Sequence, residues 1–128
     1  MKINELVKEA YEQAVKSGWH ESPRNPLEVH MLIVSEIAEA TEAVRNGKPA
    51  IYQITKYEDV LKGESTLTVE IEKFIESEKF EGEAIELADA VIRIMDYFGE
   101  RGWDLEQAIK LKMAYNKTRS YRHNGKKA

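Results

Sequence analysis

Two pairs of carboxylates stand three residues apart within segments of helical pattern. Glu36 and Glu39 form one pair in MLIVSEIAEATEAV, and Glu86 and Asp89 form the other in EAIELADAVIRI. Because residues i and i+3 share one face of a helix, each pair can present both carboxylates at one place. The spacing alone is weak support, since 23 acidic residues in a chain of 128 produce about four such pairs by chance.

A helical wheel at about 100° per residue separates the two pairs. Glu36 and Glu39 fall among apolar positions, namely Val29, Leu32, Ala40 and Ala43. Carboxylates in such surroundings are costly to bury unless something compensates them. Glu86 and Asp89 instead share a polar strip with Arg93. A solvated strip with an Asp89–Arg93 ion pair is therefore an open alternative for the second pair.

If the two pairs face each other, they form a cluster of four carboxylates. Two carboxylates roughly 6 Å apart at an effective dielectric of 20 repel by about 3 kcal/mol. Such a cluster raises its own pKa values or attracts cations. With oxygen as the only ligand atom, the matching ion is Mg²⁺, with Mn²⁺ as a substitute. The chain lacks the Glu-x-x-His pairs of di-iron bundles, and it has no cysteine for a thiolate site.

A basic segment near the C-terminus offers a phosphate-binding face. Lys112, Asn116 and Arg119 follow at i, i+4 and i+7, so they line one side of a helix. Their side chains suit phosphate and sugar oxygens, although basic residues at a helix C-terminus also simply complement its dipole. Trp19 and His20 precede the second helix and can stack on a nucleobase. A tryptophan at the core edge and a surface histidine are the structural alternative.

Apolar periodicity and capping signals predict four helices, at about residues 3–15, 26–45, 82–98 and 105–118. Asn25 and Asp104 are the expected N-caps, and Gly99 is the expected end of the third helix. Residues 48–80 form an insertion of ambiguous structure, and residues 120–128 form a basic tail. Within the insertion, a strand is indicated by Leu67, Val69 and Ile71, and a helix is indicated equally by Leu67, Ile71, Phe74 and Ile75. The expected fold is all-α, a four-helix bundle in a single domain over residues 1–128.

Composition limits the function classes. The chain has 42% hydrophobic residues, and 19 basic against 23 acidic residues leave a net charge of −4. This balance gives no general electrostatic attraction to nucleic acid or to an anionic membrane. No apolar run approaches the roughly 20 residues of a bilayer span, and the N-terminus lacks the apolar region of a signal peptide. We therefore expect a soluble, cytoplasmic protein with neither nucleic-acid nor membrane partners.

These segments together resemble a known family. SEIAEATEAVRNGK followed by ELADAVIRIMDYFGERGWDLEQAIKLKMAYNKTR is similar to the MazG-like nucleoside triphosphate pyrophosphohydrolases of the all-α NTP pyrophosphatase superfamily. The family pattern is ExxE, then ExxD, then Lys and Asn on the next helix. The resemblance covers about residues 17–125. The 48–80 insertion is longer than in compact members, and the chain holds a single copy rather than tandem domains.

The resemblance implies an activity and an assembly. It implies Mg²⁺-dependent hydrolysis of a (deoxy)nucleoside triphosphate to the monophosphate and pyrophosphate, in a homodimer or homotetramer. Glu36, Glu39, Glu86 and Asp89 would bind the metal, and Glu39 or Glu36 would orient or deprotonate the attacking water. Three alternatives stay open: action on phosphoribosyl-ATP, action on dUTP and dUDP, and a helical interaction module without catalysis.

Overall fold

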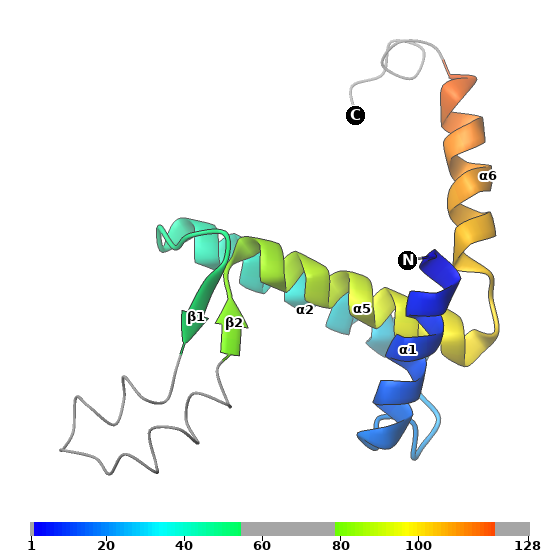
Figure 1. Cartoon of the computed structure of the whole chain (residues 1–128), viewed down its shortest axis with the longest axis horizontal. Coiled ribbons are helices and arrows are strands. Elements are labelled where there is room, and N and C mark those ends of the chain that lie inside the picture. The colour runs from blue at the N-terminus through cyan, green and yellow to red at the C-terminus, as the bar shows by residue number, and fades with distance from the viewer. Residues whose placement is uncertain (1, 55–78, 120–128) are drawn as a thin grey trace. The chain divides into compact units, whose positions relative to one another are not determined.

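The chain is mostly helical. The computed structural model describes residues 2–54 and 79–119. Within these residues there are four helices and two short strands: α1 (Ile3–Lys16), α2 (Pro26–Arg45), β1 (Tyr52–Ile54), β2 (Lys79–Glu81), α5 (Glu83–Arg101) and α6 (Leu105–Lys117) (Figure 1). The expectation of a mainly helical chain is confirmed, and a small hairpin is added to it.

The chain divides into two compact units. The first comprises Met1–Asn25 and Ile92–Ala128, and the second comprises Pro26–Val91. Helix α5 therefore contributes its first half to the second unit and its last half to the first. The expectation of a single domain over residues 1–128 stays a prediction.

Local sequence signals set most helix ends. The Asp104 side chain accepts a hydrogen bond of 2.9 Å from the backbone N–H of Gln107, which makes it the N-cap of α6, as expected. Helix α2 ends before Gly47, which has a φ of 67°. The backbone N–H of Lys48 then donates to the Ala43 carbonyl at 3.0 Å. Left-handed glycine in this position closes the last helical turn.

The third helix, α5, ends later than the sequence predicted, at Arg101 instead of near Gly99. Helix α5 continues through Gly99 to Arg101, and Gly102, with a φ of 70°, is the residue that terminates it. This helical position is occupied by glycine because α1 passes close to α5 there: a Cβ at position 99 would lie 2.5 Å from the Cβ of Tyr11. Glycine here serves close packing of two helices.

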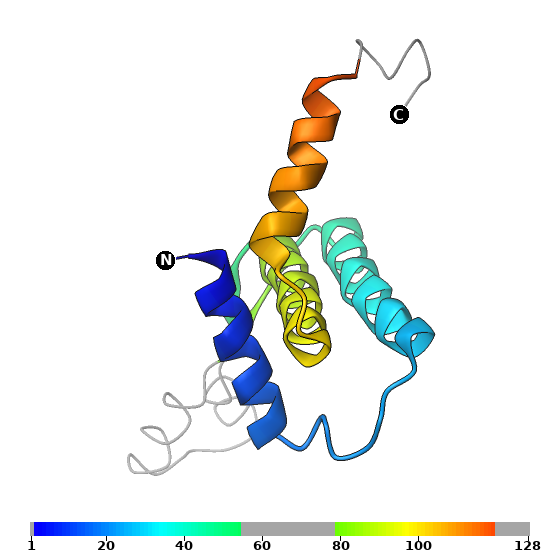
Figure 2. The same ribbon diagram turned by 90° about the vertical axis from the view of Figure 1, so that its right-hand side faces the viewer.

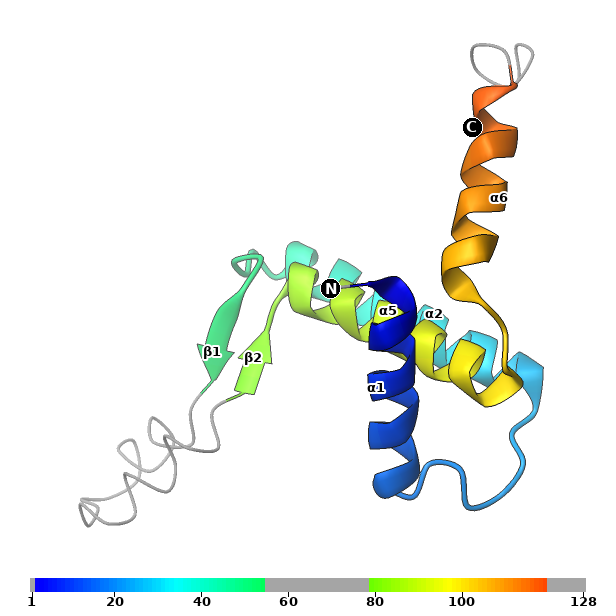
Figure 3. The same cartoon turned by 45° about the vertical axis from the view of Figure 1, so that its right-hand side comes forward.

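In the second unit, α2 lies beside the first part of α5, and the hairpin connects their neighbouring ends (Figures 1 and 3). Strands β1 and β2 are antiparallel, and Tyr52 is the partner of Glu81. Gly82, with a φ of 120°, turns the chain from β2 into α5 against the Ala50 carbonyl. Of the 48–80 insertion, residues 55–78 lie outside the described part, as does the 120–128 tail.

In the first unit, the start of α1 packs against the start of α6 (Figure 2). The side chains of Val7 and Leu105 are buried. His20 faces a carboxylate on both sides, with Nε2 2.7 Å from Asp96 and Nδ1 2.8 Å from Glu100. Arg24 contacts the same two carboxylates, so the network balances two negative groups against two bases. His20 is thus a structural residue of the connector between α1 and α2, and only 10% of its side chain is exposed.

None of the helices in residues 2–54 and 79–119 combines the length and apolar character needed to cross a membrane.

Candidate functional site

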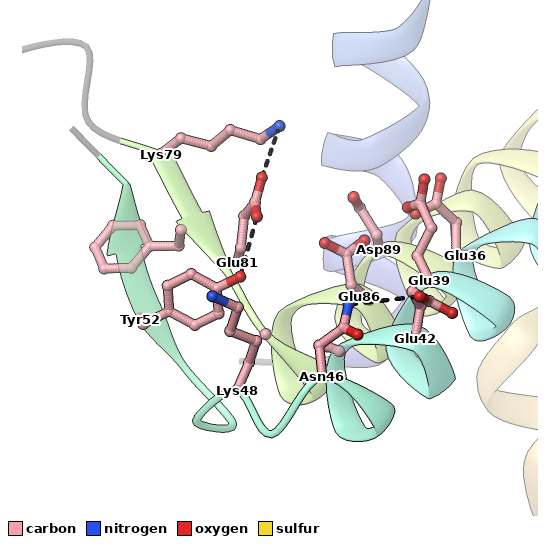
Figure 4. A pocket seen from close by; sticks show the side chains of 13 residues that line it. Glu36, Glu39, Glu42, Asn46, Lys48, Tyr52, Lys79, Glu81, Glu86 and Asp89 are labelled. Carbon is pink, nitrogen blue, oxygen red and sulfur yellow. Dashed lines mark hydrogen bonds and ion pairs between the residues drawn. The ribbon is translucent and has the colours of Figure 1, made fainter. Parts of the chain in front are cut away.

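The carboxylates of both predicted pairs line one cavity in the second unit. Its volume is about 370 Å³, and α2, α5 and the hairpin surround it. Glu36 and Glu39 reach it from α2, and Glu86 and Asp89 reach it from α5 (Figure 4). The two pairs are 47 positions apart in the chain, counted from Glu39 to Glu86. Because α2 and α5 lie side by side and antiparallel, the two carboxylate pairs come to the same level along the helix pair.

Three of these carboxylates are close enough to share one ion. Glu36, Glu86 and Asp89 each offer an oxygen atom, and these atoms lie within 4.8 Å of one another. Glu36 is buried, Glu86 is half-buried and Asp89 is exposed. A set of oxygen ligands that runs from a buried to an open position suits a hard cation such as Mg²⁺, which keeps some water or substrate oxygen in its shell.

Glu86 shows the electrostatic strain of this cluster. Its pKa is raised to about 7, first because burial disfavours the charged form, then because of a hydrogen bond to Glu39 and the charges of Glu39 and Glu36. A proton on Glu86 lets it donate to a neighbouring carboxylate, and this relieves the repulsion. A divalent cation would relieve the same repulsion in place of the proton.

The expected apolar surroundings are found for only one residue of the first pair. Glu36 is 7% exposed, whereas Glu39 is exposed to solvent in the cavity. The wheel placed both among apolar residues, but Leu32 on that face is itself 37% exposed. The wheel reports only which residues share a face of α2, whereas burial depends on what packs against that face. Glu39 is therefore accessible to a ligand.

The hairpin side of the cavity was not predicted from the sequence. Lys48, Tyr52, Lys79 and Glu81, which we call the hairpin wall, line the cavity together with the carboxylates (Figure 4). The Tyr52 hydroxyl donates to Glu81 at 3.2 Å, and Lys79 contacts the other Glu81 oxygen at 3.2 Å. Lys48, Tyr52 and Lys79 lie at the two ends of the 48–80 insertion, and Glu81 directly follows it. The strand-like alternation noted in the sequence, at Leu67, Val69 and Ile71, lies outside the described residues, so it did not indicate the hairpin wall.

The hairpin wall and the carboxylate cluster influence each other electrostatically. The pKa of Lys79 is raised, chiefly by its hydrogen bond to Glu81 and also by the charges of Glu86 and Glu39. The pKa of Tyr52 is raised by burial, by Glu81 and by Glu86. Both shifts show that the hairpin wall lies within the negative field of the cluster.

The other predicted binding residues belong to the first unit. Lys112 and Arg119 both lie over the ring of Tyr115, at 5.3 and 5.6 Å from its centroid, and Asn116 lies in the last turn of α6. The Trp19 ring lies under the guanidinium of Arg93, at 5.6 Å. The expected shared face of Lys112 and Arg119 is present. The residues that line the cavity described above all come from the second unit.

The chain was compared with protein-family models, with curated proteins and with solved structures, and it matched none of them.

Proposed function

We propose that this chain is a Mg²⁺-dependent nucleoside triphosphate pyrophosphohydrolase of the MazG-like type. It would hydrolyse (deoxy)nucleoside triphosphates to the monophosphate and pyrophosphate, as nucleotide-pool housekeeping in the cytoplasm. The observation that carries the proposal is the cluster of Glu36, Glu86 and Asp89, whose oxygen atoms lie within 4.8 Å of one another. The resemblance to the ExxE and ExxD pattern implies the same residues as metal ligands.

The donor atoms of the cluster fit the proposed metal. Glu36, Glu86 and Asp89 supply only carboxylate oxygens, and the cavity beside them has room for phosphate oxygens. Mg²⁺ held there would neutralise phosphate charge and make a water molecule more acidic. The buried Glu36 would fix the inner side of the site, and the exposed Asp89 would leave the outer side open to substrate.

Glu39 is the residue that best suits proton transfer. It is exposed in the cavity, lies outside the group of three and shares a hydrogen bond with Glu86. In the proposed step, Glu39 accepts a proton from the water whose oxygen attacks phosphorus, while the bond to the leaving pyrophosphate breaks. Glu36 is the second choice for this role, because its burial favours a fixed metal ligand.

The remaining parts of the proposal come from the family resemblance. Lys112, Asn116 and Arg119 would steady the phosphates, and Trp19 would stack on the base. The four helices would form the bundle of the MazG-like type, and the working unit would be a homodimer or homotetramer. Exposed apolar side chains on α2, with Leu27 at 70% and Met31 at 61%, support an association between copies.

The test measures pyrophosphate release with a panel of nucleoside triphosphates, dUTP, dUDP and phosphoribosyl-ATP in the presence of Mg²⁺. Glu39→Ala should lower turnover by about 10²- to 10⁴-fold while its circular dichroism remains helical. Glu42→Ala is the matched control, because Glu42 lines the same cavity but lies outside the group of three and, unlike Glu39, does not contribute to the raised pKa of Glu86. We expect this variant to retain activity.

The panel also separates the alternatives. Turnover confined to phosphoribosyl-ATP or to dUTP and dUDP would move the chain to that branch of the superfamily. A wild-type chain that releases no pyrophosphate and gains no thermal stability from Mg²⁺ would be the non-catalytic interaction module, and the proposal would be wrong.

A further inference from the structure

The described lining of the cavity is strongly unbalanced in charge. It carries six carboxylates, from Glu36, Glu39, Glu42, Glu81, Glu86 and Asp89. Among the described lining residues, Lys48 and Lys79 are the only cationic side chains, and both belong to the hairpin wall. Positive charge is thus supplied from one side of the cavity, whereas the helices supply acids alone. A ligand held here meets carboxylates on the helix side and ammonium groups on the hairpin side.

The hairpin pairing explains why these side chains point the same way. Tyr52 and Glu81 are direct partners across the antiparallel pair, and Lys79 stands two residues from Glu81 on the same face of β2. Lys48 comes from the turn before β1, and its Nζ lies 5.9 Å from the centroid of the Tyr52 ring. A cation above an aromatic face is held by the ring quadrupole. Tyr52 therefore positions Lys48 beside the cavity.

We propose that Lys48 and Lys79 are substrate-binding residues that hold phosphate oxygens of the triphosphate on the side away from the carboxylates, with Tyr52 as a positioning residue for Lys48. This inference rests on the proposed function. A polyphosphate bound at the cluster has oxygen atoms that face away from the helices, and these need donors. Lysine is a compact donor for phosphate and needs no fixed plane of approach.

Glu81 competes with a bound phosphate for Lys79. Its carboxylate pairs with Lys79 at 3.2 Å, so a phosphate that binds Lys79 must replace Glu81 in this contact. Glu81 also adds a negative charge beside the incoming anion. We therefore expect Glu81→Gln to tighten polyphosphate binding, whereas the lysine variants weaken it.

The experiment uses the full chain with Mg²⁺ and inorganic tripolyphosphate, measured by titration calorimetry, and nucleotide turnover measured in parallel. Lys48→Gln and Lys79→Gln should each weaken tripolyphosphate binding about tenfold. KM for the nucleotide should also rise about tenfold, whereas kcat should stay within about twofold of the wild-type value. Lys48→Arg should restore most of the affinity. Lys110→Gln is the matched control, because Lys110 is 75% exposed and pairs with Glu106 on α6.

The outcomes distinguish this inference from the proposed function. If the wild-type chain hydrolyses nucleotides but both glutamine variants bind tripolyphosphate like the wild type, the hairpin assignment is wrong and the proposed function stands. A fall in kcat with unchanged affinity would also overturn the binding role. If the wild-type chain neither binds tripolyphosphate nor releases pyrophosphate, both proposals fail. Thermal midpoints like that of the wild type would show that the variants are folded.

Discussion

Glu86 is the cavity residue whose pKa is shifted most clearly by the neighbouring carboxylates. It lies on α5 and shares hydrogen bonds with Glu39 and Glu36 of α2, and its pKa is raised to about 7. Between its ordinary value of 4.5 and this value, the folded chain keeps a proton that the unfolded chain has released. The folded state thus gains stability from Glu86 at low pH, and it loses that contribution as the pH rises through about 7.

This linkage predicts the pH dependence of stability in the metal-free chain. With a chelator present, the part of the unfolding free energy that depends on Glu86 should fall from about pH 5 to about pH 8. Glu86→Gln should remove this part of the slope, because glutamine stays neutral, whereas Glu42→Gln should retain it. Urea unfolding at a series of pH values measures the effect. A wild-type and a Glu86→Gln chain with identical pH profiles would contradict the assignment.

At the scale of the elements, the close approach of α1 and α5 depends on a residue without a side chain. Gly99 lies inside α5, where helix propensity disfavours glycine by about 1 kcal/mol relative to alanine. A Cβ there would lie 2.5 Å from the Cβ of Tyr11, which is backbone-proximal and cannot swing away. For Gly99→Ala, helix propensity therefore predicts a gain in stability, whereas the close packing against Tyr11 predicts a loss.

We expect packing to outweigh propensity. Gly99→Ala should destabilise the chain by about 1–3 kcal/mol, the usual cost of overpacking, and chemical denaturation would measure it. Ala88→Gly on the exposed side of the same helix is the control, and it should lose only about 1 kcal/mol through propensity. A Gly99→Ala chain more stable than the wild type would show that α1 and α5 do not pack closely there.

At the scale of the whole molecule, α2 presents an apolar stripe to solvent. Leu27, Met31 and Val34 follow at spacings of four and three residues and are 70%, 61% and 50% exposed. On α5, Leu87 and Val91 are also 42% and 46% exposed. An exposed apolar stripe along one face of a helix is typical of an interaction surface. Among the described residues, the helices of the second unit are only α2 and the first part of α5, and two helices alone bury little apolar surface. A second copy of the chain would cover the exposed apolar side chains of α2.

We therefore predict that the chain self-associates through α2. Sedimentation or light scattering should show a dimer or a tetramer, and the thermal midpoint should rise with protein concentration. Met31→Glu should shift the chain toward the monomer, because it places a charge within the apolar stripe. Lys8→Glu, an exposed polar position on α1, should leave the association unchanged. A wild-type chain that stays monomeric at all concentrations would contradict this prediction.

The positions of the helices and of their acidic faces could be read from the sequence. Spacing at i and i+3 places Glu36 with Glu39 and Glu86 with Asp89, and Asp104 caps α6 as its sequence indicates. These features depend on residues at most four positions apart, and helical geometry fixes their relation. The roles of Lys112, Asn116, Arg119 and Trp19 stay predictions.

Only the tertiary structure decided which faces meet. The contact of Glu86 with Glu39 joins segments 47 positions apart. The Tyr52–Glu81 hydrogen bond joins the start of the insertion to the residue that follows it, 29 positions away. The solvent exposure of Glu39 and the continuation of α5 past Gly99 also depend on neighbouring elements. Strand register and helix burial arise from contacts distant in the chain, and no local pattern of residue types specifies those contacts.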